Sequence, residues 1–351
     1  MPTRKDVVLW IICIYKLLLF SSLILILVCC NQVPTKEANS STQAAGQKLQ
    51  ANTELRTVNF MPYWVANAQF AGYYVAAETG IYEKYGIKIN IIPFEPFITS
   101  TDLIKEGKVD FAPLWLVNAI ELRASGADIV NIAQPSTRSS LMLITKKKSG
   151  INTLEEMNGK KAGIWSGFDL QPRALFNKYN LDVKIIPIGS TNNLFLMDGV
   201  DIIIANWFDE YHSILNSGLS PDEMNTFFFA DYGLNFLEDG IYCLKDRLEN
   251  DPELCKNFVI ATFEGWIKAF EDPEKAIDIV IKHAADAKIP VNRVHQKWML
   301  DRYRDLYYLG EETPINTYLS RDDYQAIGNI LIESGLIKEA PPYNEFYRPV
   351  L

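Results

Sequence analysis

The chain has 351 residues, of which 48% are hydrophobic and 22% are charged, so it can bury a substantial core and does not belong to the disordered class. Its length favours about two domains. The formal net charge of −9 argues against binding to a nucleic-acid backbone, which usually requires a basic surface. The 3 histidines and 5 cysteines are too few and too scattered for a metal cluster, so we expect neither a metal site nor a cofactor.

The first thirty residues are typical of an export signal. Arg4 and Lys5 precede an apolar stretch that is broken once by Lys16. Its run at 17–28 is short for a bilayer span but suits the apolar core of a signal peptide. The run ends in Cys29 and Cys30, followed by polar residues, and this resembles a bacterial lipobox, in which Gly, Ala or Ser usually precedes the lipidated cysteine. We expect residues 1–30 to be a lipoprotein signal peptide, with Cys30 as the lipidation site. The alternative is an uncleaved membrane anchor.

Residues 31–54 have the composition of a flexible tether, rich in Ser, Thr, Gln, Ala and Lys and almost without large apolar side chains. Folding is expected to begin near Leu55. With either kind of N-terminus, the folded part would be held at a membrane surface outside the cytoplasm, in the periplasm or on the cell surface.

Short apolar runs alternate with helical patterns from residue 58 to residue 244. The candidate strands are 58–61, 88–92, 109–112, 129–133, 141–145, 161–164, 183–188, 201–205, 226–229 and 240–244. Several of them, such as Ile202-Ile203-Ile204, are apolar at consecutive positions, which is typical of strands buried on both faces of a parallel sheet. The candidate helices 70–79, 117–125 and 208–217 each stop before a glycine. This alternation predicts an α/β fold with about two sheets.

The last hundred residues favour helices alone. Asp251-Pro252 and Asp272-Pro273 each offer an N-cap followed by a proline in the first turn. Ser320 with Asp323 resembles a capping box before a helix over 324–333. We expect this helical tail to pack on the first half of the chain.

The segment 59–87 carries the first functional signal. It runs from a strand through a polar and aromatic turn, with Trp64, Asn67 and Gln69, into a helix, a glycine and a second strand. Ligands of open α/β sheets bind at such strand-end turns. The segment resembles the first βαβ unit of the solute-binding proteins of ABC importers, in the group that binds thiamine pyrimidine precursors and is similar to pyrimidine synthases.

Three further motifs fit the same family. Residues 105–112 match its G-x-V-D-F strand entry, and residues 154–163 match the opening of its second lobe, with Met157 in place of a leucine. Residues 198–211 match a strand of that lobe and the E-Y start of the following helix. The resemblance covers about residues 55–340.

The resemblance implies the type II periplasmic-binding-protein fold. In this fold, two α/β lobes, each with a parallel-rich sheet flanked by helices, close by hinge motion on a ligand cleft between them. Residues 55–145 would form lobe 1, residues 146–242 lobe 2, and residues 243–351 a return to lobe 1 with the helical tail. The family further implies a monomer that captures a small heteroaromatic ligand, a thiamine pyrimidine precursor, and delivers it to an ABC permease in the membrane.

A cleft that holds a heteroaromatic ring needs flat apolar faces and a few polar groups that read the ring edge. Trp64 and Trp207 are the candidate faces, and Asn67 and Gln69 offer amides that both donate and accept hydrogen bonds. Glu210 is the strongest candidate, because a carboxylate can accept two hydrogen bonds from an exocyclic amine and a protonated ring nitrogen, and the resemblance places a ligand-contacting acid there. The alternatives are a core tryptophan at 64, a capping residue at 67 and an exposed helix-start glutamate at 210.

Five more aromatic residues follow strands and could line the same cleft. They are Trp115, Trp165, Phe168, Tyr211 and Tyr232. Trp115 lies just past a strand of lobe 1, and its alternative is a core role. Trp165 and Phe168 flank a glycine-containing turn whose backbone N–H groups could also meet a phosphate or a carboxylate.

The resemblance extends to a fungal enzyme that makes the thiamine pyrimidine from pyridoxal phosphate and one of its own histidines. That reaction needs a lysine and a histidine near the first turn, and residues 64–74 contain neither. We therefore predict a binding protein without catalytic residues. Two alternatives stay open: the same fold could bind riboflavin, a sulfonate or nitrate, or the protein could sense its ligand for a membrane partner without transport.

Overall fold

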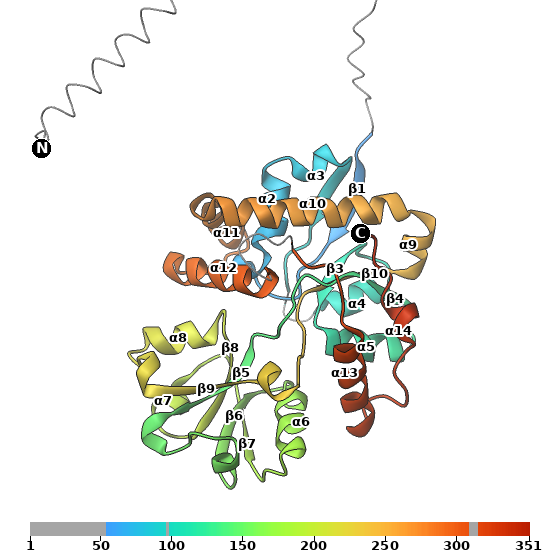
Figure 1. Cartoon of the computed structure of the whole chain (residues 1–351). Helices are drawn as coiled ribbons and strands as arrows, with labels where there is room; N and C mark the ends of the chain where they lie inside the picture. The colour runs from blue at the N-terminus through green and yellow to red at the C-terminus, as the bar shows by residue number, and fades with distance from the viewer. Residues whose placement is uncertain (1–53, 96–97, 309–314) are drawn as a thin grey trace, which may run out of the picture. The chain divides into compact units, whose positions relative to one another are not determined.

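The computed structural model describes residues 54–95, 98–308 and 315–351, and Figure 1 shows how their helices and strands are arranged. The expected signal peptide, Cys30 and the tether up to residue 53 lie outside the described residues. No helix in the described ranges is both long and apolar enough to cross a membrane.

The first sheet defines lobe 1. Its strands are β1 (Arg56–Phe60), β2 (Ile87–Ile91), β3 (Ala112–Leu114), β4 (Ile129–Ala133) and β10 (Gly240–Leu244). β1 pairs with β2 in parallel, and β10 lies antiparallel between β3 and β4. A parallel bridge between Phe60 and Phe111 links the two groups, which gives the order β2-β1-β3-β10-β4.

The second sheet defines lobe 2. Its strands are β5 (Leu141–Lys146), β6 (Lys161–Trp165), β7 (Lys184–Ile188), β8 (Ile202–Asn206) and β9 (Met224–Phe228). They lie in the order β7-β6-β8-β5-β9, in which β6 pairs in parallel with β7 and β8, and β5 runs antiparallel between β8 and β9. Both sheets therefore follow one plan, with one antiparallel strand in the fourth position.

The antiparallel strand of each sheet comes directly from a crossover between the lobes. β5 follows the segment 134–140 that leaves lobe 1, and β10 follows the segment 229–239 that returns from lobe 2. We predicted lobe boundaries after residues 145 and 242, whereas the strand pairing assigns β5 to lobe 2 and β10 to lobe 1. The pattern of a strand that is apolar on both faces does not reveal which sheet it joins.

All ten predicted strands are confirmed, nine of them within about two residues at each end. The exception is the run 109–112, where the strand β3 itself begins at Ala112 and Phe111 contributes only the bridge to Phe60. β8 confirms burial on both faces. Ile202 and Ile204 belong to a core cluster that continues into lobe 1, and Ile203 lies in the separate core of lobe 2.

Helices cover both faces of the sheets (Figure 1). In lobe 1 they are α2 (Ala71–Glu78), α3 (Ile81–Lys84), α4 (Ser100–Lys105) and α5 (Leu116–Ala124), and in lobe 2 they are α6 (Leu170–Lys178), α7 (Asn193–Leu196) and α8 (Glu210–Asn216). The tail adds α9 (Lys245–Asn250), α10 (Pro252–Glu271), α11 (Pro273–Asp286), α12 (Arg293–Tyr307), α13 (Arg321–Glu333) and α14 (Tyr343–Phe346). α10 packs along α2 and α3, whereas α13 and α14 lie on the opposite side of the sheet beside α5 (Figure 1). The tail therefore completes lobe 1, as predicted.

The predicted caps of the tail helices are confirmed. Asp251, Asp272 and Ser320 are the N-caps of α10, α11 and α13, and each side chain accepts a hydrogen bond from the backbone N–H three residues later. Local sequence thus sets where these helices begin, because the cap satisfies an N–H group that the helix itself cannot.

We expect Gly265→Ala to destabilise lobe 1. A Cβ on Gly265 would lie 2.2 Å from the carbonyl oxygen of Gly72, so α10 and α2 would have to move apart. Overpacking of this kind should lower the free energy of unfolding by about 1–3 kcal/mol, measured by urea denaturation. Gly189→Ala is the matched control, since its Cβ would meet nothing within 4 Å. An equal loss of stability in both variants would contradict the role assigned to this contact.

Candidate functional site

The turn after β1 brings together polar residues that lie far apart in the sequence. The Gln69 side chain donates a hydrogen bond to the hydroxyl of Tyr63, and that hydroxyl donates to Oδ1 of Asp239 over 2.6 Å. Asp239 lies 176 residues further along the chain, at the end of the second crossover. The predicted site residue Gln69 therefore belongs to a hydrogen-bonded group at the carboxyl end of β1. We call Tyr63, Gln69 and Asp239 the turn cluster.

Asp239 is held in an unusual position. Its backbone has φ +62, in the left-handed region that residues other than glycine rarely adopt. Its side chain is buried, and burial raises the pKa of the carboxyl to about 6, although the hydrogen bond from Tyr63 favours the anion. Surrounding contacts must fix this strained residue, a feature that is common in binding sites.

The neighbouring Glu238 connects the two crossovers. Its carboxylate accepts hydrogen bonds from Ser139 Oγ at 2.9 Å and from the backbone N–H of Ser140 at 3.0 Å. Its carbonyl oxygen accepts a third hydrogen bond from Gln134 Nε2 at 2.8 Å. Burial and the negative charge of Asp239 raise the pKa of the Glu238 carboxyl to about 8. The hinge region of the fold is therefore a buried polar network rather than a pair of loose linkers.

Three predicted aromatic residues meet across the lobes. Trp115, directly after β3 of lobe 1, contacts Phe168 of lobe 2 edge to face, with ring centroids 5.7 Å apart. Phe168 contacts Trp165, at the end of β6, in the same way at 5.8 Å. Trp115 is buried, whereas Phe168 remains 37% exposed. We call Trp115, Trp165 and Phe168 the aromatic bridge.

Glu210 lies at the start of α8, as predicted, and is only partly exposed. Its Oε2 accepts a hydrogen bond from the backbone N–H of Asn206, the last residue of β8, at 2.9 Å. Burial and the charge of the adjacent Asp209 raise the pKa of Glu210, so it takes up a proton more readily than an exposed glutamate. Such a group can donate to a ring nitrogen, or ionise and accept from a cationic ring.

Trp207 and Tyr211 contact the tail helix α12. The Trp298 indole N–H donates to the carbonyl oxygen of Trp207 at 3.0 Å, and the Trp298 ring lies 6.0 Å from that of Tyr211. The guanidinium of Arg302 lies 4.9 Å from the Trp207 ring centre. These two predicted wall residues therefore take part in a second contact between lobe 2 and the segment that completes lobe 1.

The remaining predicted residues lie apart from these contacts. Trp64 is 44% exposed and packs on Phe94, with ring centroids 5.4 Å apart, which excludes the core alternative for this residue. Asn67 is buried and accepts from the backbone N–H of Gln69, which is the capping role considered as its alternative. Tyr232 packs edge-on against Tyr179, on the α6 side of lobe 2. Their roles in ligand binding stay predictions.

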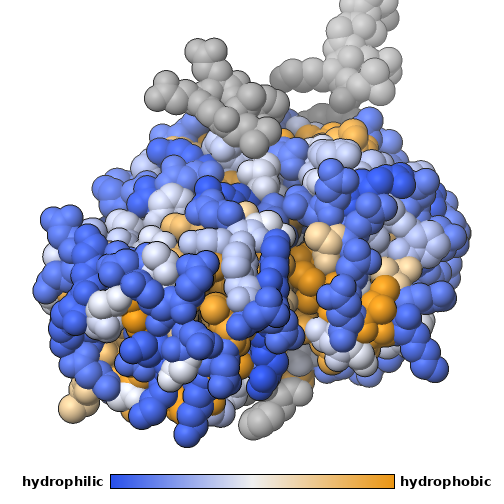
Figure 2. All heavy atoms as spheres, turned by 60° about the horizontal axis from the view of Figure 1, so that its bottom comes forward, coloured by the Kyte–Doolittle hydropathy of each residue, from blue (hydrophilic) through white to orange (hydrophobic). Residues whose placement is uncertain are grey.

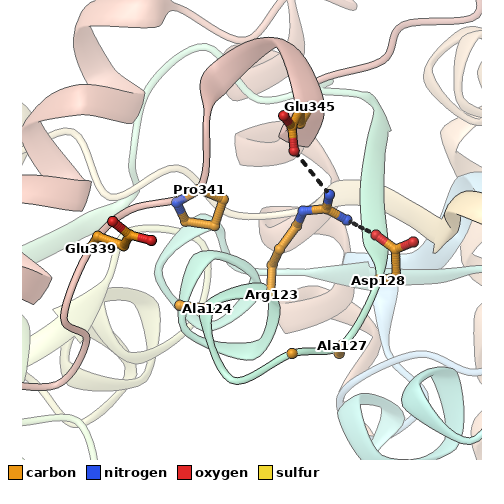
Figure 3. Close-up of a pocket in the computed structure, with 8 residues that line it drawn as sticks. Arg123, Ala124, Ala127, Asp128, Glu339, Pro341 and Glu345 are labelled. Carbon is orange, nitrogen blue, oxygen red and sulfur yellow. Dashed lines mark hydrogen bonds and ion pairs between the residues drawn. The ribbon is translucent and has the colours of Figure 1, made fainter.

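A pocket on lobe 1 lies elsewhere. Arg123 at the end of α5 pairs with Asp128 at 2.5 Å, and Glu339 and Glu345 of the tail complete the lining (Figure 3). No predicted site residue lines it. In Figure 2 hydrophilic residues cover most of the visible face, and apolar residues appear between them in separate patches. Within the described part of the chain, no group of His, Cys, Asp or Glu side chains is arranged to hold a metal ion.

A family model described as "NMT1/THI5 like" matches residues 67–276. The chain belongs to this family. The matched segment includes Gln69 and Asp239 of the turn cluster, the aromatic bridge and the start of α8, but ends before α12.

Two curated relatives differ in their named roles. The chain is 23% identical over 287 residues to the riboflavin-binding protein RibY of Chloroflexus aurantiacus, which covers 78% of this chain and 80% of that protein. It is 24% identical over 246 residues to the 4-amino-5-hydroxymethyl-2-methylpyrimidine phosphate synthase of Legionella pneumophila, which covers 67% of this chain and 76% of the synthase.

A solved structure confirms the fold class. The periplasmic aliphatic sulphonate binding protein SsuA from Escherichia coli aligns with a TM-score of 0.65 at 14% identity, over 83% of this chain and 91% of SsuA. The chain therefore has the two-lobe α/β fold of periplasmic binding proteins.

Sequence reasoning missed Tyr63, Glu238 and Asp239 as residues of the site. One signal was available. Glu238 and Asp239 directly precede Gly240 and the apolar strand that follows it. Carboxylates at the start of a buried strand require hydrogen-bonding partners. The identity of those partners was not available from the sequence, because they come from a distant turn.

We expect Glu238→Gln to keep the fold and to change how stability depends on pH. The folded pKa of about 8 lies above the ordinary value of 4.5, so the folded protein binds an extra proton between these values and the wild type loses stability as pH rises through that range. Glutamine does not titrate. The difference in the free energy of unfolding between the variant and the wild type should therefore shift by more than about 1 kcal/mol in favour of the variant between about pH 5 and about pH 8.

Urea denaturation at the two pH values measures this difference. Glu333→Gln, at an exposed position of α13, is the control and should keep a constant difference from the wild type. A constant difference for Glu238→Gln as well would contradict the raised pKa.

Proposed function

We propose that the protein is the solute-binding component of an ABC importer and that its lobes close around a small heteroaromatic molecule. The observation that carries this proposal is the aromatic bridge, in which Trp115 of lobe 1 meets Phe168 and Trp165 of lobe 2 at strand ends. Flat rings presented from two lobes suit a planar ligand, and the turn cluster supplies polar groups nearby on lobe 1.

The ligand we favour is a thiamine pyrimidine precursor, with riboflavin as the second candidate. Both are planar nitrogen heterocycles, and the names of the two relatives refer to compounds of these two kinds. The Glu210 acid could bind the amine and ring nitrogen of an aminopyrimidine together. A sulfonate or nitrate fits less well, because the turn cluster offers the acid Asp239 and no cation to an anionic ligand.

We favour binding over catalysis. Two relatives are named as pyrimidine phosphate synthases, but the stretch 64–74 of this chain lacks the lysine and the histidine that such chemistry requires there. The lipid anchor at Cys30 and the partner permease complete the proposal. Together they would hold the protein outside the cytoplasm, beside the transporter that receives its ligand.

A thermal-shift screen of the purified protein tests the ligand class. The panel contains 4-amino-5-hydroxymethyl-2-methylpyrimidine, riboflavin, an alkanesulfonate and nitrate. A ligand that binds only the folded state raises the melting temperature by mass action, so we expect a rise with the aminopyrimidine and none with the two anions. A rise with an anion alone would reject the heteroaromatic ligand while leaving the fold unaffected.

We expect Glu210→Ala to weaken binding of the aminopyrimidine by more than about ten-fold, which corresponds to about 1.4 kcal/mol. The melting temperature of the free protein should fall by at most a few degrees, because the change removes the hydrogen bond from the Asn206 backbone N–H, worth about 1 kcal/mol. Calorimetric titration gives the affinity, and Glu333→Ala serves as the exposed control. If Glu210→Ala lowered the melting temperature strongly but the folded protein still bound the aminopyrimidine with wild-type affinity, Glu210 would not belong to the binding site.

A further inference from the structure

The contact between α8 of lobe 2 and α12 of the tail contains two of the three histidines of the chain. His295 Nε2 lies 2.9 Å from Oδ1 of Asp209, the residue before α8. His295 Nδ1 lies 2.8 Å from His212 Nδ1, and the His212 ring stacks on Trp298 with centroids 4.8 Å apart and planes at 10°. In Figure 1, α12 is the tail helix that faces α8.

The short distance between the two Nδ1 atoms constrains the protons. One nitrogen must donate and the other must accept, because two N–H groups or two lone pairs would repel each other at 2.8 Å. The Asn216 side-chain nitrogen, which can only donate, lies 3.2 Å from the same Nδ1 of His212. His212 therefore accepts through Nδ1, which requires its neutral form. His295 donates through Nδ1 to His212 and through Nε2 to Asp209, so it carries a proton on both ring nitrogens. Adding a proton to His212 removes both contacts.

We propose that Asp209, His212 and His295 form a latch that holds the two lobes closed and that acid opens it. The latch residues do not belong to the proposed binding residues, but Asp209 precedes Glu210 directly. Closing the latch would thus fix the start of α8, and with it the acid that reads the ligand edge. The latch itself is inferred from these contacts alone. Its purpose, which is to fix the ligand-binding acid, rests on the proposed function.

The surrounding charges support the direction of this effect. Burial and the nearby His295 lower the pKa of His212 below 6.5, and only Asp209 opposes them. The other charged or titratable groups at this contact are Glu210 and Tyr211 on α8 and Arg302 on α12, and Arg302 pairs with Asp305 at 2.7 Å. A histidine whose pKa is lowered in the folded protein stabilises the folded arrangement at pH values above its ordinary pKa. That contribution is lost as the pH falls. Protonation of His212 therefore opens the latch as pH falls.

Hydrogen–deuterium exchange of the ligand-free protein tests the latch without any assumption about the ligand. After correction for the intrinsic pH dependence of exchange, we expect α8 and α12 to lose protection between about pH 7.5 and about pH 5, across the range in which histidine titrates. α13, on the opposite side of lobe 1, should not change. His295→Gln should show the low protection of α8 and α12 at both pH values.

His283→Gln is the matched control, because this third histidine lies on α11, stacks on Tyr74 and contacts Glu78, away from lobe 2. It should behave like the wild type. Unchanged protection of α8 and α12 in the wild type at both pH values would overturn the proposal, as would equal effects of the two histidine variants. Since no ligand is added, a failed ligand screen and a failed latch are separate results.

Discussion

The buried carboxylate of Glu238 is the constraint on which the two-lobe arrangement depends. Each sheet takes its antiparallel strand from a crossover, so the two crossovers must run side by side and keep a fixed register. Glu238 on one crossover accepts hydrogen bonds from Ser139 and Ser140 on the other, inside the protein. An unpaired acid there would carry a large desolvation penalty, and these partners offset it. The same network limits how the lobes can move, since they must pivot about segments that are themselves tied together.

The next residue, Asp239, joins the hinge to the turn after β1 through its hydrogen bond with Tyr63. A pair of adjacent acids thus connects the region about which the lobes would pivot with the region where we place the ligand. Coupling of this kind needs no long pathway, because Tyr63 contacts Asp239 directly. The lobes also meet at two separated places beyond the hinge, the aromatic bridge and the α8–α12 contact. The first is mainly apolar, whereas the second contains titratable groups, so pH should act on the two contacts differently.

Part of the candidate site could be predicted from sequence. Trp115, Trp165, Phe168 and Glu210 were predicted because each follows a predicted strand, and strand ends are where α/β folds place ligands. The tail residues that contact Trp207 could not be found in this way. Trp298 and Arg302 lie in a helical tail whose own pattern gives no sign that it reaches lobe 2. Cys243 and Cys255 give a similar case, since only the tertiary structure shows that both are free and buried in the same core of lobe 1.

The sequence by itself determined the local structure: ten strands from their apolar runs, and the starts of three tail helices from their capping residues. These features depend on residues that lie only a few positions apart in the sequence, so a local pattern is enough to predict them. Only the tertiary structure decided which sheet receives β5 and β10, which acids share the hinge, and that α12 meets α8. Those outcomes depend on contacts such as Tyr63 with Asp239, made by residues 176 positions apart, and no local pattern specifies such a partner.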